Sequence, residues 1–548
     1  MRLGVDFGTT HTVVAYADRG NYPVLSFTDE AGDAREWFPS VVADADGELV
    51  CGFQAIACLE DRGSGLYSFK RLLSDPHAVP DSQVQVGALS LTVAELITRF
   101  LAALREAILT RSNLPNARRL GGEELEAVIA VPAHAHGAQR LITLDAFRAA
   151  GFSPMAMLNE PSAAGFEFTH RHRALLNSRR DHVVVYVLGG GVFFKSLVRI
   201  RDTHHEVLAT AGLGDLGGND FDQVLWELVL AKAGLDARAL TPRAQLALLM
   251  ECRDAKERLS PSSRKLSFDL DAVLEERLGA ASQVSIAVAD YYDACTPLVE
   301  RSLQSMRPVM ASFEGALQAE SSLASHVAGI YVVGGASCLP LVPRLLRLQF
   351  GRRVHKSPYP SAAVAIGLAI AADDNAGFEL SDRLAHTFGV FREGCAGQEV
   401  TFDPIFTPET SVPPRVGRRV SCRRVYRAAH NVGHYRFLEC SAVSQDGRPF
   451  GDVVPSGDVL FPFDASLREQ GLDLARVPVR RTADRGPRIE EEYTLDEHGM
   501  VAVTIRNLGD FTSGSRALLN DDCTIIGLNV GGFDAAKHRA QPLVTDAR

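Results

Sequence analysis

The sequence predicts an α/β fold followed by a smaller all-β domain. From residue 1 to about 377, apolar β-branched runs typical of buried strands alternate with long helical patterns. The sequence pattern changes near Phe378. Residues 387–507 contain short strand-like runs separated by turn dipeptides such as Asp446-Gly447. The runs at 453–463 and 488–506 alternate apolar and polar residues, which is typical of antiparallel strands.

The first part contains strands that are apolar throughout, as expected when both faces of a sheet are covered. The runs at 128–131, 183–187 and 330–333 are of this kind. Helical patterns lie between them, at 92–109, 139–150, 241–259 and, Ala-rich, at 362–372. This order of elements favours a layered sheet covered by helices.

We therefore divide the chain into four segments. The α/β domain occupies residues 1–377, a linker 378–386, the all-β domain 387–507, and a Gly- and Asp-rich segment 508–548. The last segment is either a tail or an extra β element, and the pattern leaves both open. A length of 548 residues allows about three to five domains or subdomains.

Composition limits the classes of partner. The chain has 57 Lys and Arg against 67 Asp and Glu, a net charge of −10, which disfavours general nucleic-acid binding. No apolar run approaches the ~18 residues of a membrane helix, and the N-terminus lacks a secretory pattern. The nine cysteines are scattered without a Cys-x-x-Cys pair. We expect a cytoplasmic protein with reduced thiols that binds neither nucleic acid nor membrane.

Two glycine-containing turns repeat at the start of the two halves of the α/β domain. Residues 6–10 (DFGTT) follow the first strand, and residues 187–192 (VLGGGV) follow a strand in mid-chain. Each predicts a hairpin turn, and glycine allows backbone N–H groups to approach an anion closely. Two such turns facing each other would hold the phosphates of a nucleotide from both sides.

Together with these turns, further motifs resemble the seventy-kilodalton heat-shock chaperones of the DnaK type, which have an actin-type ATPase fold. The motifs follow one another in the family's order, at 6–12, 69–73, 130–133 with 139–140, 159–164, 217–222, 255–260, 332–337 and 363–367. Weaker similarity at 402–406 and 490–505 extends to the family's peptide-binding β-sandwich. The resemblance implies an actin-like two-lobed nucleotide-binding domain and a β-sandwich domain, and we expect no helical lid after Asn507.

The resemblance also implies the site residues, with ATP or ADP and Mg²⁺ as cofactors. Lys70, Glu160 and Asp6 would be catalytic, and Asp6 would hold the Mg²⁺ through water. The expected nucleotide-binding residues are Gly8, Thr9, Thr10, His11, Gly189, Gly190, Gly191, Gly217, Gly218, Lys256, Ser260, Gly334 and Gly335. Without the resemblance, Lys70 would be interpreted as part of a solvated basic face and Glu160 as a turn carboxylate.

The second phosphate turn departs from the family pattern. Val187, Val192 and Phe194 stand where the family has Asp, Thr and Asp. Apolar side chains neither hold the water molecules of Mg²⁺ nor accept a proton, and losing such a group typically costs about 10²–10⁴ in rate. The nucleoside side differs too, at Cys338, Ser361 and Glu257. We expect a nucleotide-binding cleft with weak or absent hydrolysis.

Three other features have less specific patterns. The segment 378–384 has two leucines interrupted by polar residues, so it would bury little apolar area, which makes coupling through it doubtful. The pairs His134/His136 and His170/His172 have strand-face spacing, and we interpret them as surface histidines, with a metal site as the alternative. The Arg-rich run 415–427 predicts an exposed edge strand whose charges prevent pairing with other strands, or a binding surface for an acidic partner.

Three functions fit these observations. The leading interpretation is an ATP-binding chaperone-like protein whose β domain binds unfolded peptide or a dedicated protein partner, with co-chaperones as further partners. A pseudo-ATPase scaffold that recruits one dedicated partner is the first alternative. A phosphotransferase of the actin fold acting on a small molecule is the second, and the β domain disfavours it because sugar kinases of this fold have no such domain.

Overall fold

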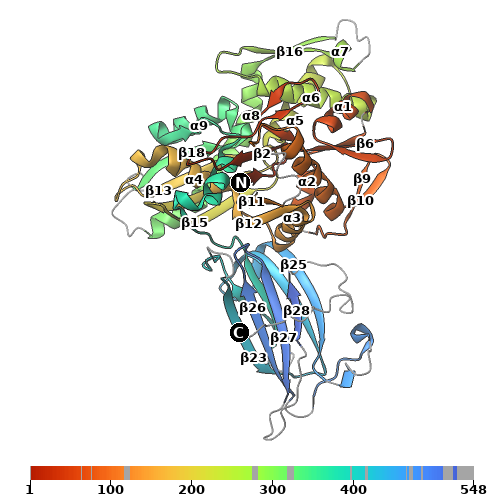
Figure 1. The fold of residues 1–548 in the computed structure, drawn as a ribbon, viewed down its shortest axis with the longest axis vertical. Coiled ribbons are helices and arrows are strands. Elements are labelled where there is room, and N and C mark those ends of the chain that lie inside the picture. The colour runs from red at the N-terminus through yellow and green to blue at the C-terminus, as the bar shows by residue number, and fades with distance from the viewer. Residues whose placement is uncertain are drawn as a thin grey trace. The chain divides into compact units, whose positions relative to one another are not determined.

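The fold is described from a computed structural model, in which two compact units each have a hydrophobic core. The described residues are 2–62, 64–75, 77–115, 124–274, 282–316, 326–394, 398–413, 418–464, 466–467, 473–482, 486–509 and 522–526. The first unit comprises Met1–Asp75, Asp81–His134 and Thr143–Asp382. The second comprises Pro76–Pro80, Ala135–Ile142 and Arg383–Arg548. Figure 1 shows the helices and strands of both units.

The first unit is built around two sheets with the same plan. One sheet has the order β12-β11-β1-β2-β5, and the other β19-β18-β13-β14-β15-β20. In each sheet an antiparallel hairpin, β1–β2 or β13–β14, is followed by strands parallel to its first member. The strands are β1 Leu3–Asp6, β2 His11–Tyr16, β5 Phe38–Pro39, β11 Leu125–Val131, β12 Phe152–Asn159, β13 His182–Leu188, β14 Phe193–Arg201, β15 His204–Leu213, β18 Val327–Val333, β19 Val354–Lys356 and β20 Glu379–Ser381. The two glycine turns therefore occupy equivalent places.

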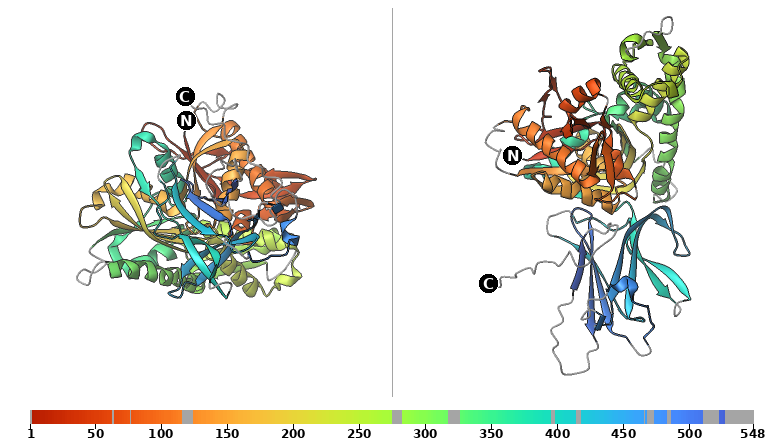
Figure 2. Two further views of the ribbon diagram at one scale, coloured as in Figure 1. Left: turned by 90° about the horizontal axis from the view of Figure 1, so that it is seen from below. Right: turned by 90° about the vertical axis from the view of Figure 1, so that its right-hand side faces the viewer.

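Helices flank these sheets (Figures 1 and 2). They are α1 Phe53–Arg62, α2 Val93–Thr110, α3 Gly137–Ala149, α4 Glu160–His172, α5 Gly218–Ala233, α6 Pro242–Glu257, α7 Leu270–Leu274, α8 Val288–Ala316, α9 Leu341–Phe350 and α10 Ala363–Ala372. Smaller sheets use β3 Phe27–Thr28, β4 Ala34–Arg35, β6 Val41–Ala45, β7 Glu48–Cys51, β8 Gly65–Tyr67, β9 Gln83–Val86, β10 Leu89–Thr92, β16 Lys265–Asp269 and β17 Gln283–Ala287.

The predicted strands and helices of this part are confirmed. Their ends agree to within two residues, except that β11 and β18 begin three residues earlier than predicted. Local chemistry explains several ends. Thr92 caps α2 by accepting from the N–H of Glu95, and Thr241 caps α6 by accepting from that of Ala244. Gly234 ends α5 in a left-handed conformation at φ 69°. Within the described residues, every helix is too short or too polar to cross a bilayer.

A close crossing of α4 and α10 holds the centre of the first unit together. Helix α10 is apolar on all sides and almost wholly buried, which is typical of a core helix. A Cβ at Gly367 of α10 would lie 1.8 Å from the carbonyl oxygen of Ala163 in α4. A Cβ at Gly4 of β1 would lie 2.3 Å from the backbone nitrogen of Ala369. Both glycines are therefore required by backbone proximity, not by turn geometry.

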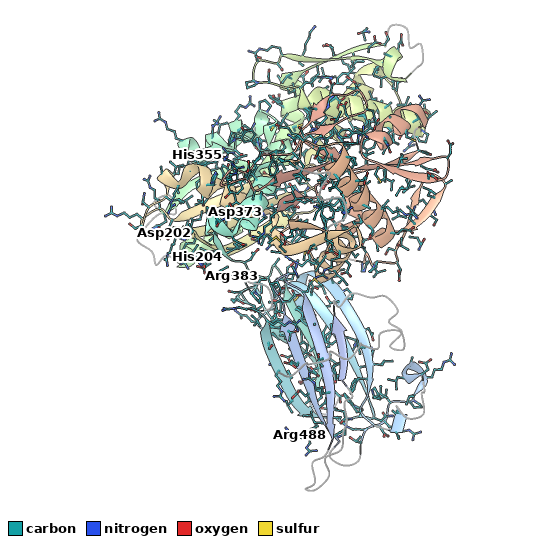
Figure 3. The ribbon with its side chains drawn as sticks, viewed as in Figure 1. Asp202, His204, His355, Asp373, Arg383 and Arg488 are labelled. Carbon is teal, nitrogen blue, oxygen red and sulfur yellow. The ribbon has the colours of Figure 1, made fainter. Side chains whose placement is uncertain are left out.

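The segment after α10 joins the first unit as a strand. Strand β20 pairs parallel with β15, and Glu379 Oε2 lies 3.6 Å from the Nδ1 of His204. His204 is labelled in Figure 3. The buried carboxylate of Asp382 accepts hydrogen bonds from Asn159 Nδ2 at 2.9 Å and Ser162 Oγ at 3.2 Å. Half-buried Phe378 and Leu380 pack against the core, and the ring centroid of Phe378 lies 5.5 Å from those of Phe166 and His205. Backbone pairing, polar contacts and this ring contact together dock the segment.

The second unit contains an antiparallel β-sandwich, as predicted (Figure 2). Its sheets have the orders β22-β21-β24-β25 and β23-β26-β27-β28. The strands are β21 Thr387–Gly394, β22 Glu399–Phe406, β23 Val420–Arg427, β24 Val432–Val443, β25 Pro449–Pro462, β26 Arg488–Leu495, β27 Val501–Gly509 and β28 Asp522–Ile526. Strand β28 shows that part of segment 508–548 is an extra β element; residues 510–521 and 527–548 lie outside the described part.

The Arg-rich run forms an edge of this sandwich. Strand β23 lies at the end of its sheet and its residues alternate between exposed and half-buried, which confirms the charged β edge. Residues 414–417 of the run lie outside the described residues. Between the sheets, Arg392 of β21 donates two hydrogen bonds, of 2.7 and 2.6 Å, to Glu491 of β26. This buried ion pair fixes how the two sheets face each other.

We predict that Gly367→Ala destabilises the first unit by about 1–3 kcal/mol, because the new methyl group forces α10 away from α4. The matched control is Gly165→Ala in α4, where the Cβ would meet only side-chain atoms at 3.9–4.0 Å. This control is expected to be neutral or slightly stabilising, since Ala favours helix. Urea unfolding followed by circular dichroism measures both. Equal midpoints for the two variants would contradict the close crossing.

Candidate nucleotide site

The two glycine hairpins of the first unit lie against each other. A Cβ at Gly190 would be 2.7 Å from the side chain of Thr10, and one at Gly191 would be 2.8 Å from that of Thr9. The backbone of the turn after β13 therefore packs directly against the threonine side chains of the turn after β1. The structure thus brings together two sets of residues that the sequence placed about 180 positions apart.

The second hairpin is anchored through its carbonyl groups. The carbonyl oxygens of Gly189 and Gly190 accept from the N–H groups of Gly218 at 2.9 Å and Asn219 at 2.8 Å. Arg71 donates to the carbonyl oxygen of Gly191 at 2.8 Å. These bonds place the start of α5 against the hairpin. Helix α5 thus presents its positive N-terminal end to this region.

Gly217 makes that contact possible. A Cβ on it would lie 2.4 Å from the carbonyl carbon of Gly191 and 2.6 Å from the nitrogen of Val192. Backbone atoms do not move aside cheaply, so only glycine fits here. The sequence motif predicted Gly217 and Gly218 as site residues, and the structure places both beside the second hairpin. Their contact with nucleotide stays a prediction.

Lys70 and Glu160 form a buried pair in the same region. Lys70 Nζ lies 3.2 Å from Glu160 Oε1, and the two residues are only 5% and 8% exposed. Glu160 is the first residue of α4, where the helix dipole favours a carboxylate. The solvated basic face is thus excluded for Lys70. A buried amine and carboxylate in contact form a group able to orient water or transfer a proton.

Asp6 and His11 have strongly shifted pKa values. Burial, together with the neighbouring Glu160 carboxylate, raises the pKa of Asp6 to about 7, although Lys70 opposes the shift. Burial and the positive charges of Arg253 and Lys256 lower the pKa of His11 to about 3. His11 is therefore neutral at physiological pH, and its ring stacks on Trp37 with centroids 4.0 Å apart. A cation at Asp6 would favour the ionised carboxylate.

Lys256 is held below the start of α5. Its Nζ lies 2.6 Å from Asp222 Oδ1 and donates to the carbonyl oxygen of Gly218 at 3.1 Å. Arg253 pairs with the other oxygen of Asp222 at 3.2 Å. The sequence analysis did not identify Asp222, Arg253 and Arg71 as site residues, although Asp222 lies in the family-like motif 217–222. A salt-bridge partner 34 residues away along the chain leaves no spacing signal.

The remaining predicted residues have simple surroundings. Gly334 follows β18 with φ 90°, and a Cβ there would meet the carbonyl oxygen of Leu188 at 2.3 Å. At Gly335 the space is open to 4.0 Å. Ser260 Oγ exchanges hydrogen bonds with Ser262 and Ser263. Gly8 packs on the backbone of His11, which closes the first hairpin.

The three apolar replacements in the second hairpin are packed into the core. Val187, Val192 and Phe194 are 3%, 8% and 0% exposed. They belong to one apolar cluster with residues of β11, α4, β18 and α10. The ring of Phe194 also lies 4.8 Å from that of His134. Each fills space in the apolar core at a position where the DnaK-type pattern has a polar residue.

The replaced positions on the predicted nucleoside side are exposed. Cys338, Ser361 and Glu257 all have exposed side chains. The Cβ of Ser361 lies 4.0 Å from the position of a Cβ on Gly335, so Ser361 borders that space.

Comparison with known proteins agrees with this geometry. The family model described as "Hsp70 protein" matches residues 2–390. The chain belongs to the Hsp70 family. The resemblance drawn from the motifs is confirmed, and so is the fold class of an actin-like α/β unit followed by a β-sandwich.

Relatives of this Hsp70-family chain include two bacterial chaperones. One is "Chaperone protein HscA homolog" from Colwellia psychrerythraea, 32% identical over 384 residues, which cover 68% of this chain and 58% of the relative. The protein of the same name from Burkholderia ambifaria is 33% identical over 394 residues, covering 69% and 59%. The chain thus spans just under three fifths of the length of these relatives.

We predict that Asp6→Asn stabilises the nucleotide-free protein at pH 8 by roughly 2–4 °C in melting temperature, and much less at pH 4.5. Asp6 has a pKa of about 7 when folded and near 3.9 when unfolded, so the unfolded state loses its proton first as pH rises. Stability from this group is therefore present at low pH and lost between about pH 4 and 7. Asn does not ionise and lacks this loss.

Thermal scans between pH 4.5 and 8 measure the effect. Asp81→Asn, at an exposed position of the same unit, serves as control and should follow the wild-type profile. If Asp6→Asn and wild type change in parallel across the range, the raised pKa is wrong.

Proposed function

We propose that this Hsp70-family protein binds ATP or ADP with Mg²⁺ in its first unit and hydrolyses ATP weakly or not at all. The observation that carries the proposal is the second hairpin. Two of its three glycines, Gly190 and Gly191, lie at the first hairpin, while Val187, Val192 and Phe194 are buried in an apolar cluster. The backbone for gripping phosphates is present, and the side chains for chemistry at that hairpin are not.

Each half of the proposed site has a distinct part. Gly8, Thr9 and Thr10 would offer N–H groups and hydroxyls to the phosphates from one side, and Gly190 and Gly191 would offer N–H groups from the other. Gly334 and Gly335 would leave room for the nucleoside. Lys256, although paired with Asp222, lies next to Gly218 at the same hairpin.

Magnesium and the attacking water would depend on the first half. Asp6 would hold the ion through its water molecules, since Mg²⁺ usually keeps several waters and binds few protein ligands. Lys70 would supply positive charge near the terminal phosphate, and Glu160 would orient water. With the opposite hairpin apolar, charge and proton acceptance come from one side only. This asymmetry supports a rate about 10²–10⁴ below that of a complete site.

We further propose that the second unit binds unfolded peptide or a dedicated protein partner. Large apolar side chains are exposed there on edge strands, at Val400 on β22, Val420 and Val425 on β23, and Phe450 and Val453 on β25. An edge strand with exposed apolar side chains is suited to pairing with an extended peptide. The curated relatives are named chaperone proteins, which is in keeping with this role.

Co-chaperones and a cytoplasmic location belong to the same proposal. The described cysteines Cys51, Cys58, Cys252, Cys295, Cys338, Cys422 and Cys440 are free thiols, as in proteins of a reducing compartment. The pseudo-ATPase scaffold shares the fold and the partner surface, and differs only in the absence of nucleotide turnover.

Calorimetric titration of the full chain with ATP and ADP, with and without Mg²⁺, tests nucleotide binding. We expect saturable binding to one site, strengthened by Mg²⁺, and hydrolysis at least a hundredfold slower than that of the HscA relatives. Undetectable binding would overturn the nucleotide proposal and leave the scaffold. Fast steady-state hydrolysis that Lys70→Ala abolishes would overturn the weak-turnover part.

A glycine pair provides the matched control for this test. Gly217→Ala should weaken binding at least tenfold, because its methyl group would displace the backbone of Gly191 and Val192. Gly214→Ala, whose Cβ would meet only the His134 ring at 3.6 Å, should leave binding unchanged. Equal affinities in the two variants would mean that nucleotide does not depend on the hairpin.

A separate experiment tests the β edge. Phe450→Ser combined with Val453→Ser should weaken binding of a fluorescent, extended, leucine-rich peptide about tenfold or more, since burying each side chain is worth about 1.5–3 kcal/mol. Val479→Ser removes an equally exposed side chain outside the strands and is the control. Fluorescence anisotropy measures the affinities. Unchanged binding in the double variant would place the peptide elsewhere.

A further inference from the structure

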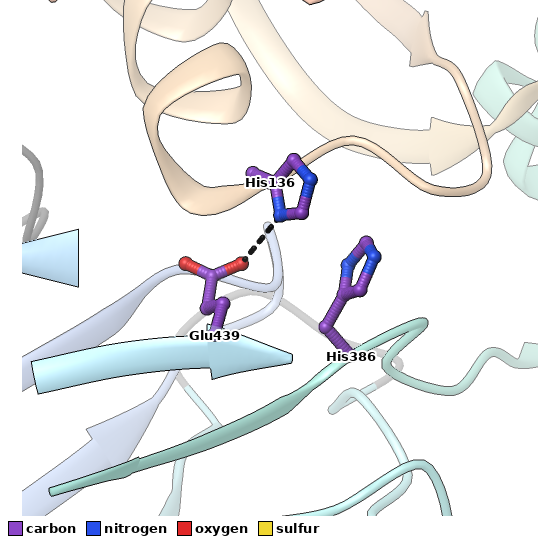
Figure 4. Close-up of side chains that lie close together, drawn as sticks. All are labelled: His136, His386 and Glu439. Atoms are coloured by element: carbon purple, nitrogen blue, oxygen red, sulfur yellow. Dashed lines mark ion pairs between the residues drawn. The ribbon is translucent and has the colours of Figure 1, made fainter. Parts of the chain in front are cut away.

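A group of potential metal ligands lies inside the second unit, remote in sequence from the predicted nucleotide residues. The ligand atoms of His136, His386 and Glu439 all lie within 4.8 Å of one another (Figure 4). His136 directly precedes α3, His386 directly precedes β21, and Glu439 lies on β24. All three belong to the second unit. The fold thus gathers them from three separate segments.

The spacing of the two histidine pairs predicted that they lie on a strand face, and the structure places them elsewhere. His136 and His134 lie in the loop between β11 and α3, and His170 and His172 lie on α4. His136 is half-buried, and its partner ring comes from His386, which is 7% exposed. The two rings stack with centroids 4.2 Å apart and planes 20° from parallel. The interpretation of His136 as an ordinary surface histidine is therefore wrong.

Glu439 is held in place as a ligand would be. The N–H of Gly137 donates to both of its oxygens at 3.1 Å, and the buried hydroxyl of Ser456 donates to Oε1 at 2.8 Å. Such bonds fix the orientation of a ligating carboxylate. The orientation of the carboxylate is thus fixed by three hydrogen bonds before any cation binds.

His136 has an unsatisfied nitrogen in this group. Its Nδ1 is buried and makes no hydrogen bond within the described part of the chain. The nearest acidic atom, Glu439 Oε2, lies 3.6 Å away, which is beyond hydrogen-bond length. A buried polar atom without a partner calls for an explanation such as an ion or water. A metal between Nδ1 and Oε2 satisfies both.

A small cavity next to the group leaves room for a further ligand. It has a volume of about 30 Å³ and is lined in part by His386, Glu439, Gly137 and Arg140. That is enough for about two water molecules. The guanidinium of Arg140 is bound by the carbonyl oxygens of Ala135 and His498, at 3.3 and 3.2 Å. Its charge opposes a cation, so two imidazoles with one carboxylate favour moderate affinity.

We propose that His136, His386 and Glu439 bind a divalent transition metal ion of the zinc type, with water from the adjoining cavity as the fourth ligand. Imidazole nitrogen and carboxylate oxygen are the donors that such ions take, and two nitrogens with one oxygen exclude a preference for Ca²⁺ or Mg²⁺. A tetrahedral site places ligand atoms roughly 3.3 Å apart, so only small side-chain rotations are needed. Bound metal would tie the residue before α3 to β21 and β24.

Titration of the chelator-treated full chain with Co²⁺ and Zn²⁺ tests this site. We expect one saturable site per chain, with the visible Co²⁺ bands of a tetrahedral nitrogen and oxygen site, displaced by Zn²⁺. His136→Ala, His386→Ala and Glu439→Gln should each weaken binding at least tenfold. His434→Ala, an exposed histidine paired with Asp458 in the same sheet, should not. Equal binding in all four variants would overturn the site.

A measurement on the unmodified chain covers the case in which a variant fails to fold. Diethyl pyrocarbonate labels accessible histidines, and mass spectrometry locates the label. Zn²⁺ should protect His136 and His386 from the reagent while His434 remains reactive. Absence of protection, or a Co²⁺ spectrum with the charge-transfer band of a thiolate ligand, would show that the ion binds elsewhere and refute the proposal.

Discussion

The contact between two glycine hairpins is the constraint on which the first unit depends. Thr9 and Thr10 lie so close to Gly190 and Gly191 that any side chain on these glycines would collide with them. The start of α5 reaches the same point through Gly217, where again only hydrogen fits. The two hairpins meet through threonine side chains against glycine backbone, and the start of α5 meets the second hairpin backbone to backbone. In the proposed function, this proximity, more than any single side chain, provides the place for a phosphate chain.

The second hairpin retains its turn, but apolar side chains stabilise it where the family pattern has polar ones. Polar groups at positions 187, 192 and 194 would need partners, because an unpaired buried polar group is costly. Valine and phenylalanine remove that need and each contribute about 1.5–3 kcal/mol when fully buried. The carbonyl groups of the three glycines remain bonded to Gly218, Asn219 and Arg71. These bonds and the apolar packing hold the turn without a ligand, which is in keeping with the proposal of binding without turnover.

The fold was largely predictable because its signals are local. Apolar strands, the helical patterns at 92–109 and 241–259 and the turn-rich β region each carry their period in a short window. Pairings between distant residues carry no such signal. Lys70 and Glu160, 90 positions apart, were each predicted as site residues through the family motifs, but their ion pair was not predicted, nor was that of Asp222 with Lys256. The His136, His386 and Glu439 group was missed because its members are separated by 250 and 53 residues and its spacing suggested a strand.

The segment after α10 illustrates how a weak sequence signal hides a specific contact. Its apolar contacts come from half-buried Phe378 and Leu380, and a judgement from hydrophobicity alone predicts weak docking. The structure adds Asp382, which accepts hydrogen bonds from Asn159 and Ser162. These residues flank Glu160, the partner of Lys70. Hydrogen bonds to a charged group are worth about 1.5–3 kcal/mol, as much as one buried leucine, and they are directional. A polar segment therefore docks with comparable strength, and it does so at the turn that positions Glu160.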